Sequence, residues 1–220
     1  VITMFDRDVF RVHLAVFFDN ETKVPVLKLA STIKDIFINM FPNEPQILPL
    51  PPDAPNDAPR CIFQMEGKDV SLNFSLVRMD YDAGLVDGTQ WKNHIEVIAN
   101  SFINICKICD IDIKRIGIVA QVRNAKEAIE YLNKKVVIDE FVKSDEKNIS
   151  WVSHKKINSN LGINIFITLR FNENELQNTD VSIIDVNTDV TSELQKDNLI
   201  RVISILTSQI GERIENVFGE

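Results

Sequence analysis

The chain has 220 residues, of which 45% are hydrophobic and 25% are charged, and it carries a formal net charge of −8 at pH 7. This composition is that of an average globular protein and excludes a wholly disordered chain, while the acidic balance argues against a general phosphate-binding surface. No apolar stretch reaches the ~18 residues that cross a bilayer, and residues 1–7 lack the basic and apolar regions of a signal peptide. We therefore expect a cytoplasmic protein with no membrane contact.

The first forty residues predict a strand followed by a helix. Apolar residues alternate with polar or small ones from Val12 to Phe18, which is the period of a strand buried mainly on one face. Behind Pro25, apolar residues recur at three- and four-residue steps from Val26 to Met40. This spacing predicts a helix that ends before the next proline.

A proline-rich segment follows, since seven of the eight prolines lie between Pro42 and Pro59. Because proline fixes φ and lacks a backbone donor, this segment can form neither a helix nor a central strand. Its apolar part, Ile47–Pro52, is extended and pre-ordered. We expect it to dock on the protein's own sheet or on a partner, with Leu48 and Leu50 as the anchoring side chains.

The next fifty residues predict a hairpin, a loop and a long helix. The segments Arg60–Glu66 and Asp69–Met79 flank Gly67-Lys68, which indicates a two-residue type II′ turn with glycine at its first central position. Two glycines and three aspartates between Asp80 and Gly88 indicate a loop. A stripe of apolar residues then predicts a helix from Gln90 to Cys109.

The second half repeats this order of elements. A β-branched run predicts one strand, a capping box predicts a short helix, and three apolar segments separated by polar turns predict further strands before a final helix. The expected strands are Ile111–Arg123, Ile149–Ile157, Leu161–Phe171 and Val181–Val190, and the expected helices are Ala125–Asn133 and Glu193–Phe218.

Both halves therefore run strand, helix, strands, helix. Adjacent strands joined by tight turns imply antiparallel pairing, so the predicted class is α+β, with mostly antiparallel sheets and packed helices. The matching order favours a pseudo-duplication, with one α+β half at residues 1–110, which contains the proline-rich segment 42–59, and a second half at residues 111–220. We expect the halves to form one integrated globular unit with their long helices in equivalent positions.

Four segments resemble a sporadically distributed family of bacterial proteins of unknown function. They are the apolar first strand, the Phe41-Pro42 end of the first helix with its proline-rich run, Lys114–Ile118, and Ile183–Thr188 before the final helix. The resemblance covers most of the chain and brings no established activity and no catalytic residues. The sporadic distribution of the family implies a role in a bacterial accessory or defence-type system.

The three cysteines are Cys61, Cys106 and Cys109. The last two have the Cys-x-x-Cys spacing of redox and zinc sites. However, a zinc site needs a second pair of ligands, and a redox motif begins a helix, whereas this pair lies at a predicted helix end. We expect buried, reduced thiols, and no cofactor.

A candidate metal site lies on the predicted strand 181–190, where Asp185, Asn187 and Asp189 share one face at positions i, i+2 and i+4. Three oxygen-bearing side chains in a row can hold a divalent cation, and an enzyme site would combine Asp185 and Asp189 with the lone His154. The spacing is not that of an EF-hand loop. A solvated acidic sheet face accounts for the same residues, and we favour that interpretation, without a metal.

A candidate binding surface combines Trp151 with Lys155 and Lys156. If the predicted strands are neighbours, further basic residues join them: Lys114, Arg115, His154 and Arg170. Such a basic and aromatic sheet surface can contact single-stranded nucleic acid. Outward lysines that block edge pairing explain the same pattern, and this is the interpretation we favour.

The sequence thus favours a non-catalytic binding or assembly protein whose ligand it does not identify. A protein partner or self-association is preferred to nucleic acid because of the acidic balance. The alternative is an enzyme with the dispersed Asp and His site above, dependent on a divalent metal. No glycine-rich phosphate loop, Gly-x-Ser-x-Gly or His-Glu-x-x-His motif indicates a known reaction. The residues expected to bind a partner are Leu48, Leu50, Trp151, Lys155 and Lys156.

Overall fold

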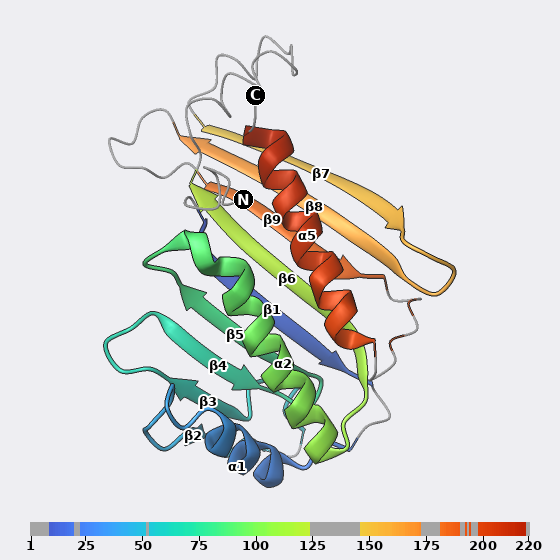
Figure 1. The fold of residues 1–220 in the computed structure, drawn as a ribbon. Helices are drawn as coiled ribbons and strands as arrows, with labels where there is room; N and C mark the ends of the chain where they lie inside the picture. Colours follow the sequence, from blue (N-terminus) through green and yellow to red (C-terminus); the bar gives the residue numbers. More distant parts are fainter. Residues whose placement is uncertain are drawn as a thin grey trace.

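The computed structural model describes residues 9–19, 23–51, 53–123, 146–172, 181–189, 192, 194 and 198–218. These residues form one antiparallel sheet of nine strands in the order β2-β3-β4-β5-β1-β6-β9-β8-β7 (Figure 1). The strands are β1 (Val9–Phe18), β2 (Gln46–Ile47), β3 (Cys61–Gln64), β4 (Val70–Phe74), β5 (Arg78–Gly84), β6 (Ile113–Arg123), β7 (Glu146–Lys156), β8 (Gly162–Asn172) and β9 (Val181–Thr188). This architecture confirms the predicted α+β class.

The α-helices of the described residues all lie on one face of this sheet (Figure 1). They are α1 (Val26–Ile36), α2 (Trp91–Cys109) and α5 (Leu199–Phe218). Helix α2 begins after a short 3₁₀ turn, whose Thr89 amide donates to the Asp87 carboxylate at 2.9 Å, and ends at Asp110 in the left-handed conformation. The hydrophobic core fills the space between the helices and the sheet.

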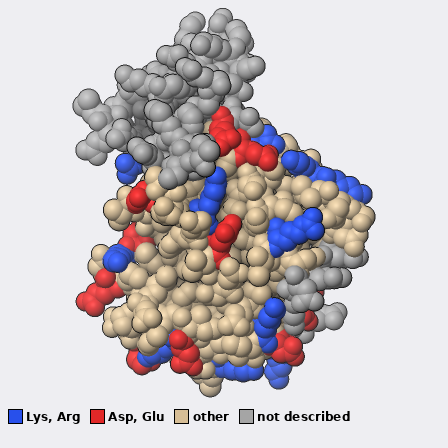
Figure 2. Space-filling model, in the orientation of Figure 1, with Lys and Arg blue, Asp and Glu red and all other residues tan. Residues whose placement is uncertain are grey.

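None of the helices in the described part of the chain is both long and apolar enough to span a membrane. On the helix-bearing face, acidic and basic side chains are scattered among uncharged residues, and neither sign gathers into a continuous field over the described residues (Figure 2). Apolar side chains are exposed on these helices as well, among them Val97 of α2 and Ile200 of α5, which are 63% and 59% exposed.

Apolar side chains that alternate along the strands form the sheet side of the core. On β1 the apolar residues Val12, Leu14 and Val16 are at most 1% exposed, and they oppose equally buried residues of β6 in register. Because successive side chains of a strand point to opposite faces, the residues between them lie on the face away from the helices. The predicted strand from Val12 to Phe18 is thus confirmed. One of its faces is buried against the helices, and the other points away from them.

The sheet has an internal two-fold order. Strands β1 and β6 lie side by side in its centre, and outward from them come β5, β4 and β3 on one side and β9, β8 and β7 on the other. The strand beside each central strand is followed in the chain by a long helix, α2 or α5. This is the order expected of a pseudo-duplication, with the two long helices in equivalent positions.

The predicted hairpin and loop need correction between residues 66 and 84. The turn is centred on Glu66-Gly67, since the Lys68 amide donates to the Met65 carbonyl at 3.2 Å, and Gly67 has a φ of 69° at the second central position. The predicted strand Asp69–Met79 is two strands, because Ser75 accepts hydrogen bonds from the backbone within a turn. The predicted loop Asp80–Gly88 is strand β5 as far as Gly84.

Several helix bounds also differ from expectation. Helix α1 ends at Ile36 and is followed by turns, whereas the apolar spacing predicted helix to Met40. Helix α5 begins at Leu199 in the described residues. The helix predicted at Ala125–Asn133 lies outside the described residues.

The proline-rich segment is docked along the edge of the protein's own sheet. Strand β2 pairs with β3, and the Leu48 amide donates to the Arg60 carbonyl at 3.0 Å. The Arg60 guanidinium in turn donates to the carbonyls of Ala54 and Pro55. Leu48 and Leu50 are half-buried here. Their binding of a separate partner remains a prediction.

Candidate functional site

The face of the sheet away from the helices, which we call the open face, carries most of the chemistry. In the described part of the chain no helix covers it (Figure 1). Strand register brings the following side chains onto it: Arg11, His13, Phe17, Arg78, Asp80, Asp82, Arg115, Val119, Val152, His154, Asn164, Phe166, Ile183, Asp185 and Asn187. They fall into a charged cluster, a hydrogen-bonded chain and an apolar patch.

The charged cluster joins β1 to β5 through His13. Its ring nitrogens lie 3.2 Å from Asp80 Oδ1 and 3.4 Å from Asp82 Oδ2. Arg11 pairs with Asp82 and, at 2.8 Å, with the exposed Asp69. Arg78 Nε lies 2.9 Å from Asp80 Oδ2, and the Asp80 side chain is only 5% exposed. Acids and bases therefore alternate across the two strands, and their charges offset one another.

Burial by itself lowers the pKa of His13, but the hydrogen bonds and charges of Asp80 and Asp82 outweigh it and raise this pKa to about 9. In the same way, burial raises the pKa of Asp82, yet the bonds from His13 and Arg11 leave it below its ordinary value. His13 is therefore a cation at neutral pH. A cationic imidazole has no lone pair with which to act as a general base, so the cluster is an ionic network.

A chain of hydrogen bonds crosses the other half of the open face from β7 to β9. His154 Nδ1 contacts Asn164 Oδ1, Asn164 Nδ2 donates to Asn187 Oδ1 at 3.4 Å, and Asn187 Nδ2 donates to Asp185 Oδ1 at 3.2 Å. Each donor points toward the carboxylate, so the bonds polarise one another in one direction. Asn164 is the member that the sequence did not suggest, because only the register of β7 and β8 shows that it bridges the others.

Of the predicted row, Asp185 and Asn187 lie along one side of β9, whereas Asp189 follows the last residue of that strand, Thr188. Burial raises the pKa of Asp185, against the opposing effects of the Asn187 amide and of the charges of Arg115 and His13. Among the described residues, no three His, Cys, Asp or Glu side chains are grouped as metal ligands. Asp189 instead lines a hollow of about 250 Å³ with His154 and Lys156.

The apolar patch lies beside Asp185 and consists of Val119, Val152, Phe166 and Ile183. Val152 and Phe166 are direct cross-strand neighbours, 52% and 37% exposed. Val119 and Ile183 are half-buried, and Val119 and Phe166 both oppose Asp185 from its neighbouring strands. Val152 and Phe166 thus adjoin each other, and Val119 and Ile183 flank the same Asp185, one from β6 and the other along β9.

The basic surface predicted around Trp151 and Lys155 does not form as one surface. Lys156 and His154 lie on the open face, whereas Trp151 and Lys155 project to the helix side, where Lys155 Nζ donates to Gln209 of α5 at 3.0 Å. Alternation along the strand causes this separation. A partner-binding role for Trp151, Lys155 or Lys156 singly remains a prediction.

The cysteines lie in the core. Cys61, Cys106 and Cys109 are at most 4% exposed, and the Cys109 thiol donates to Thr32 Oγ1 at 3.6 Å. Burial raises the pKa of the Cys61 thiol to about 11. Such thiols are poor nucleophiles, because the thiolate is the reactive form.

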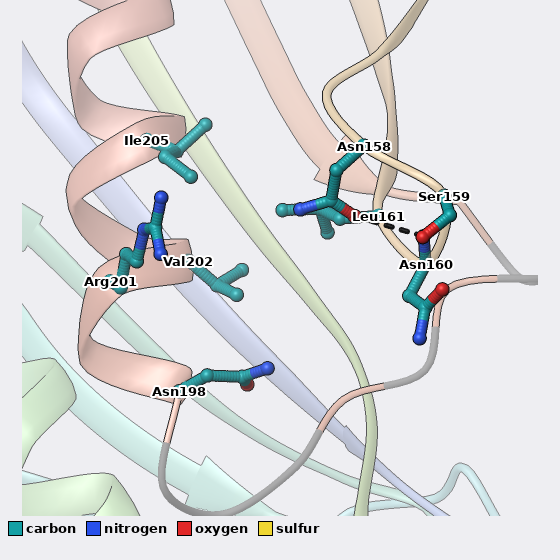
Figure 3. Close-up of a pocket in the computed structure, with 8 residues that line it drawn as sticks. All are labelled: Asn158, Ser159, Asn160, Leu161, Asn198, Arg201, Val202 and Ile205. Carbon is teal, nitrogen blue, oxygen red and sulfur yellow. Dashed lines mark hydrogen bonds between the residues drawn. The ribbon is translucent and has the colours of Figure 1, made fainter.

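A separate hollow of about 290 Å³ lies between the β7–β8 turn and the first turns of α5. Figure 3 shows its lining residues, Asn158, Ser159, Asn160, Leu161, Asn198, Arg201, Val202 and Ile205. The Asn158 side chain accepts a hydrogen bond from the Asn160 amide and so serves the turn itself. Arg201 is the one charged member of this lining. The hollow therefore offers no pair of acid and base.

Comparisons with known proteins do not identify a family. No protein-family model matches the sequence, and no curated protein matches it either. Among solved structures, the chain is similar to the rolling circle replication initiator protein from Geobacillus stearothermophilus, with 12% identity and a TM-score of 0.32 over 92% of this chain and 78% of that one.

Proposed function

We propose that this protein is a non-catalytic binding or assembly protein that docks a protein partner on its open face. The observation that carries the proposal is the apolar patch, in which Val152 and Phe166 are exposed side by side on the face of the sheet that no described helix covers. Single exposed apolar residues are ordinary, but contiguous ones rimmed by polar groups are typical of an interaction site. The system that the protein serves is, by its family resemblance, a bacterial accessory or defence-type one.

The surroundings of the patch favour a protein partner. A protein interface has an apolar centre and a polar rim, and here the rim is formed by the hydrogen-bonded chain and the charged cluster. Both sets of side chains are already held by neighbours, so docking costs little side-chain ordering. A net charge of −8 disfavours nucleic acid, because nucleic-acid binding requires a surplus of cations.

The enzyme hypothesis lacks an activated group among the described residues. His13 is held as a cation. A ring nitrogen of His154 contacts the Asn164 amide, and a carboxylate oxygen of Asp185 accepts a hydrogen bond from the Asn187 amide. The hollow that brings His154 and Asp189 together also contains Lys156, whose charge disfavours a bound cation. We therefore prefer binding to catalysis.

The test is to capture the partner and then locate it. The tagged chain is used to isolate a complex from its own host, and the purified complex is mapped by hydrogen exchange. We expect protection in β7, β8 and β9, and loss of the complex with Phe166→Asp. The matched control is Val97→Asp, which changes a residue of α2 that is 63% exposed on the helix side and should leave the complex intact.

Two results would overturn the proposal. One is a complex that survives Phe166→Asp while circular dichroism shows both variants folded. The other is protection confined to the helix-bearing face. Light scattering of the purified chain distinguishes self-association, which would appear as a dimer that Phe166→Asp converts to a monomer.

A further inference from the structure

The two outer edges of the sheet differ in length and in protection. Among the described residues, β2 forms one edge and β7 forms the other (Figure 1). Strand β2 has two residues and lies between Pro45 and Pro49, whereas β7 has 11 residues and contains no proline. Proteins protect an edge by a short strand, a proline, a bulge or outward charges, because its unpaired backbone groups can bind a strand of another chain. The β2 edge has two of these protections.

Strand β7 is regular, and its middle carries no charge. It pairs with β8 in a single register from residue 146 to residue 156, so it contains no bulge. Lys155 projects to the helix side, where it donates to Gln209, and Lys156 is the last residue of the strand. The middle of the strand, Ser150–Ser153, is uncharged. The lysines therefore leave the centre of this edge unprotected.

The turn between β7 and β8 shows which backbone groups point to the outer edge. The Ile157 amide donates to the Leu161 carbonyl at 2.9 Å, and this pair continues the register of the two strands. Because hydrogen-bonded pairs alternate along an antiparallel ladder, the N–H and C=O groups of Ser150, Val152 and His154 point away from β8. No strand of the described chain pairs with them there. These three residues therefore present donors and acceptors for another strand.

We propose that β7 pairs antiparallel with β7 of a second copy of this chain, about a two-fold axis at Val152. Two identical strands that run antiparallel satisfy two-fold symmetry, since each offers the other the same row of groups. In this register Val152 exchanges both backbone hydrogen bonds with Val152 of the second copy. Ser150 does the same with His154 of the second copy. All three outward-pointing residues are thereby paired.

The side chains of β7 favour this register. Val152 is 52% exposed and adjoins Phe166 of β8, so the two copies form one apolar row through the axis. On the helix side, Trp151 of one copy lies opposite Ser153 of the other, which sets a large side chain against a small one. Position 156 lies opposite position 148, an asparagine, so the terminal lysines do not face each other.

This inference goes beyond the docking function proposed above and does not depend on it. Edge pairing uses the backbone of β7, whereas docking uses side chains of the open face. Because the two-fold axis is perpendicular to the sheet, the open faces of both copies lie on the same side. The dimer therefore presents two apolar patches to one partner surface.

The first experiment measures self-association of the whole chain by sedimentation equilibrium, up to about 0.5 mM because edge pairing makes a small interface. We expect a monomer–dimer equilibrium that Val152→Pro weakens at least about tenfold. Proline removes the outward N–H at the axis and leaves the β7–β8 ladder its hydrogen bonds. The matched control is Val152→Thr, which keeps the N–H and the branched shape and should weaken the dimer by less than about threefold.

The second experiment tests the register by cysteine cross-linking, and it also serves if Val152→Pro does not fold. The Cα atoms of a hydrogen-bonded pair lie about 5.5 Å apart, which a disulfide can span. Val152→Cys should therefore form an intermolecular disulfide in oxidised glutathione. His154→Cys should not, because residues 154 of the two copies lie about 14 Å apart, but a mixture of His154→Cys and Ser150→Cys chains should. The native cysteines are buried in the core.

Four results would overturn the proposal. They are a chain that stays monomeric at about 0.5 mM, a dimer that a folded Val152→Pro leaves unchanged, cross-linking of His154→Cys as fast as that of Val152→Cys, and a dimer that Phe166→Asp abolishes. The last would place self-association on the open face. A monomeric chain that still captures a partner through Phe166 would refute edge pairing and leave the docking proposal standing.

Discussion

Replacing His13 with glutamine should remove a pH-dependent part of the stability. The pKa of His13 is raised from 6.5 to about 9 in the folded protein. A group with a raised pKa stabilises the fold in full below its unfolded pKa, and this contribution is lost as pH rises through the folded pKa. We expect the free energy of unfolding of the natural protein to fall between about pH 6.5 and pH 10, and that of His13→Gln to lack this fall.

The magnitude follows from the pKa difference and from exposure. A difference of about 2.5 corresponds to at most about 3.4 kcal/mol. The His13 side chain is 34% exposed, so solvent screening reduces this contribution. We expect about 1–2 kcal/mol to be lost by His13→Gln at pH 6, and little difference between the two proteins at pH 10.

Urea titrations at several pH values measure this effect through the fluorescence of Trp91, which is buried, and Trp151, which is half-buried. His154→Gln is the matched control, because it removes an exposed histidine of the same face whose ring contacts the side-chain amide of Asn164. The reasoning is refuted if His13→Gln retains the full decline with pH, or if His154→Gln removes it.

Three further stability predictions follow from the charged cluster, the docked edge and the core. Asp80→Asn should cost about 1–3 kcal/mol in urea titrations because two cations face its buried carboxylate, whereas Asp69→Asn, at a side chain 68% exposed, should cost less than about 0.5 kcal/mol. Leu48→Asp should lower the melting temperature by several degrees, and Ile47→Asp should lower it by less because Ile47 is 50% exposed. If neither substitution changes the melting temperature, the proline-rich segment is not docked. Tyr81→Phe should cost about 1 kcal/mol in the same titrations by removing the 2.7 Å hydrogen bond to a histidine of α2, and an unchanged stability would contradict that bond.

Strand β5 shows where sequence reasoning fails. Its buried side chains Met79, Tyr81 and Ala83 do alternate, and that was the available signal. Asp80, Asp82 and Gly84 between them are the residues of turns, so composition favoured a loop. This segment is a strand because it pairs with β1. There His13 and Arg11, about seventy positions away in the chain, neutralise the two carboxylates.

Only part of the candidate site could be predicted from the sequence, because the rest depends on which strands are neighbours. The period of the strand predicted that Asp185, Asn187 and Asp189 share one side of it, and β9 has Asp185 and Asn187 so placed but ends at Thr188, before Asp189. The chain through Asn164 and the patch at Phe166 depend on which strands are neighbours and in what register. A single sequence does not contain the register, since each strand there is compatible with several pairings.

The central pair of strands has a consequence for synthesis of the protein. β1 is made first, but its partner β6 begins only at Ile113, after β5 and α2 are complete. Until then a nascent first half has β1 paired with β5 on one side and bare backbone donors and acceptors on the other. A second nascent chain, turned by a half rotation, can offer the same antiparallel partner. The longer β6 takes to emerge, the longer β1 has an unpaired edge at which a second chain can pair.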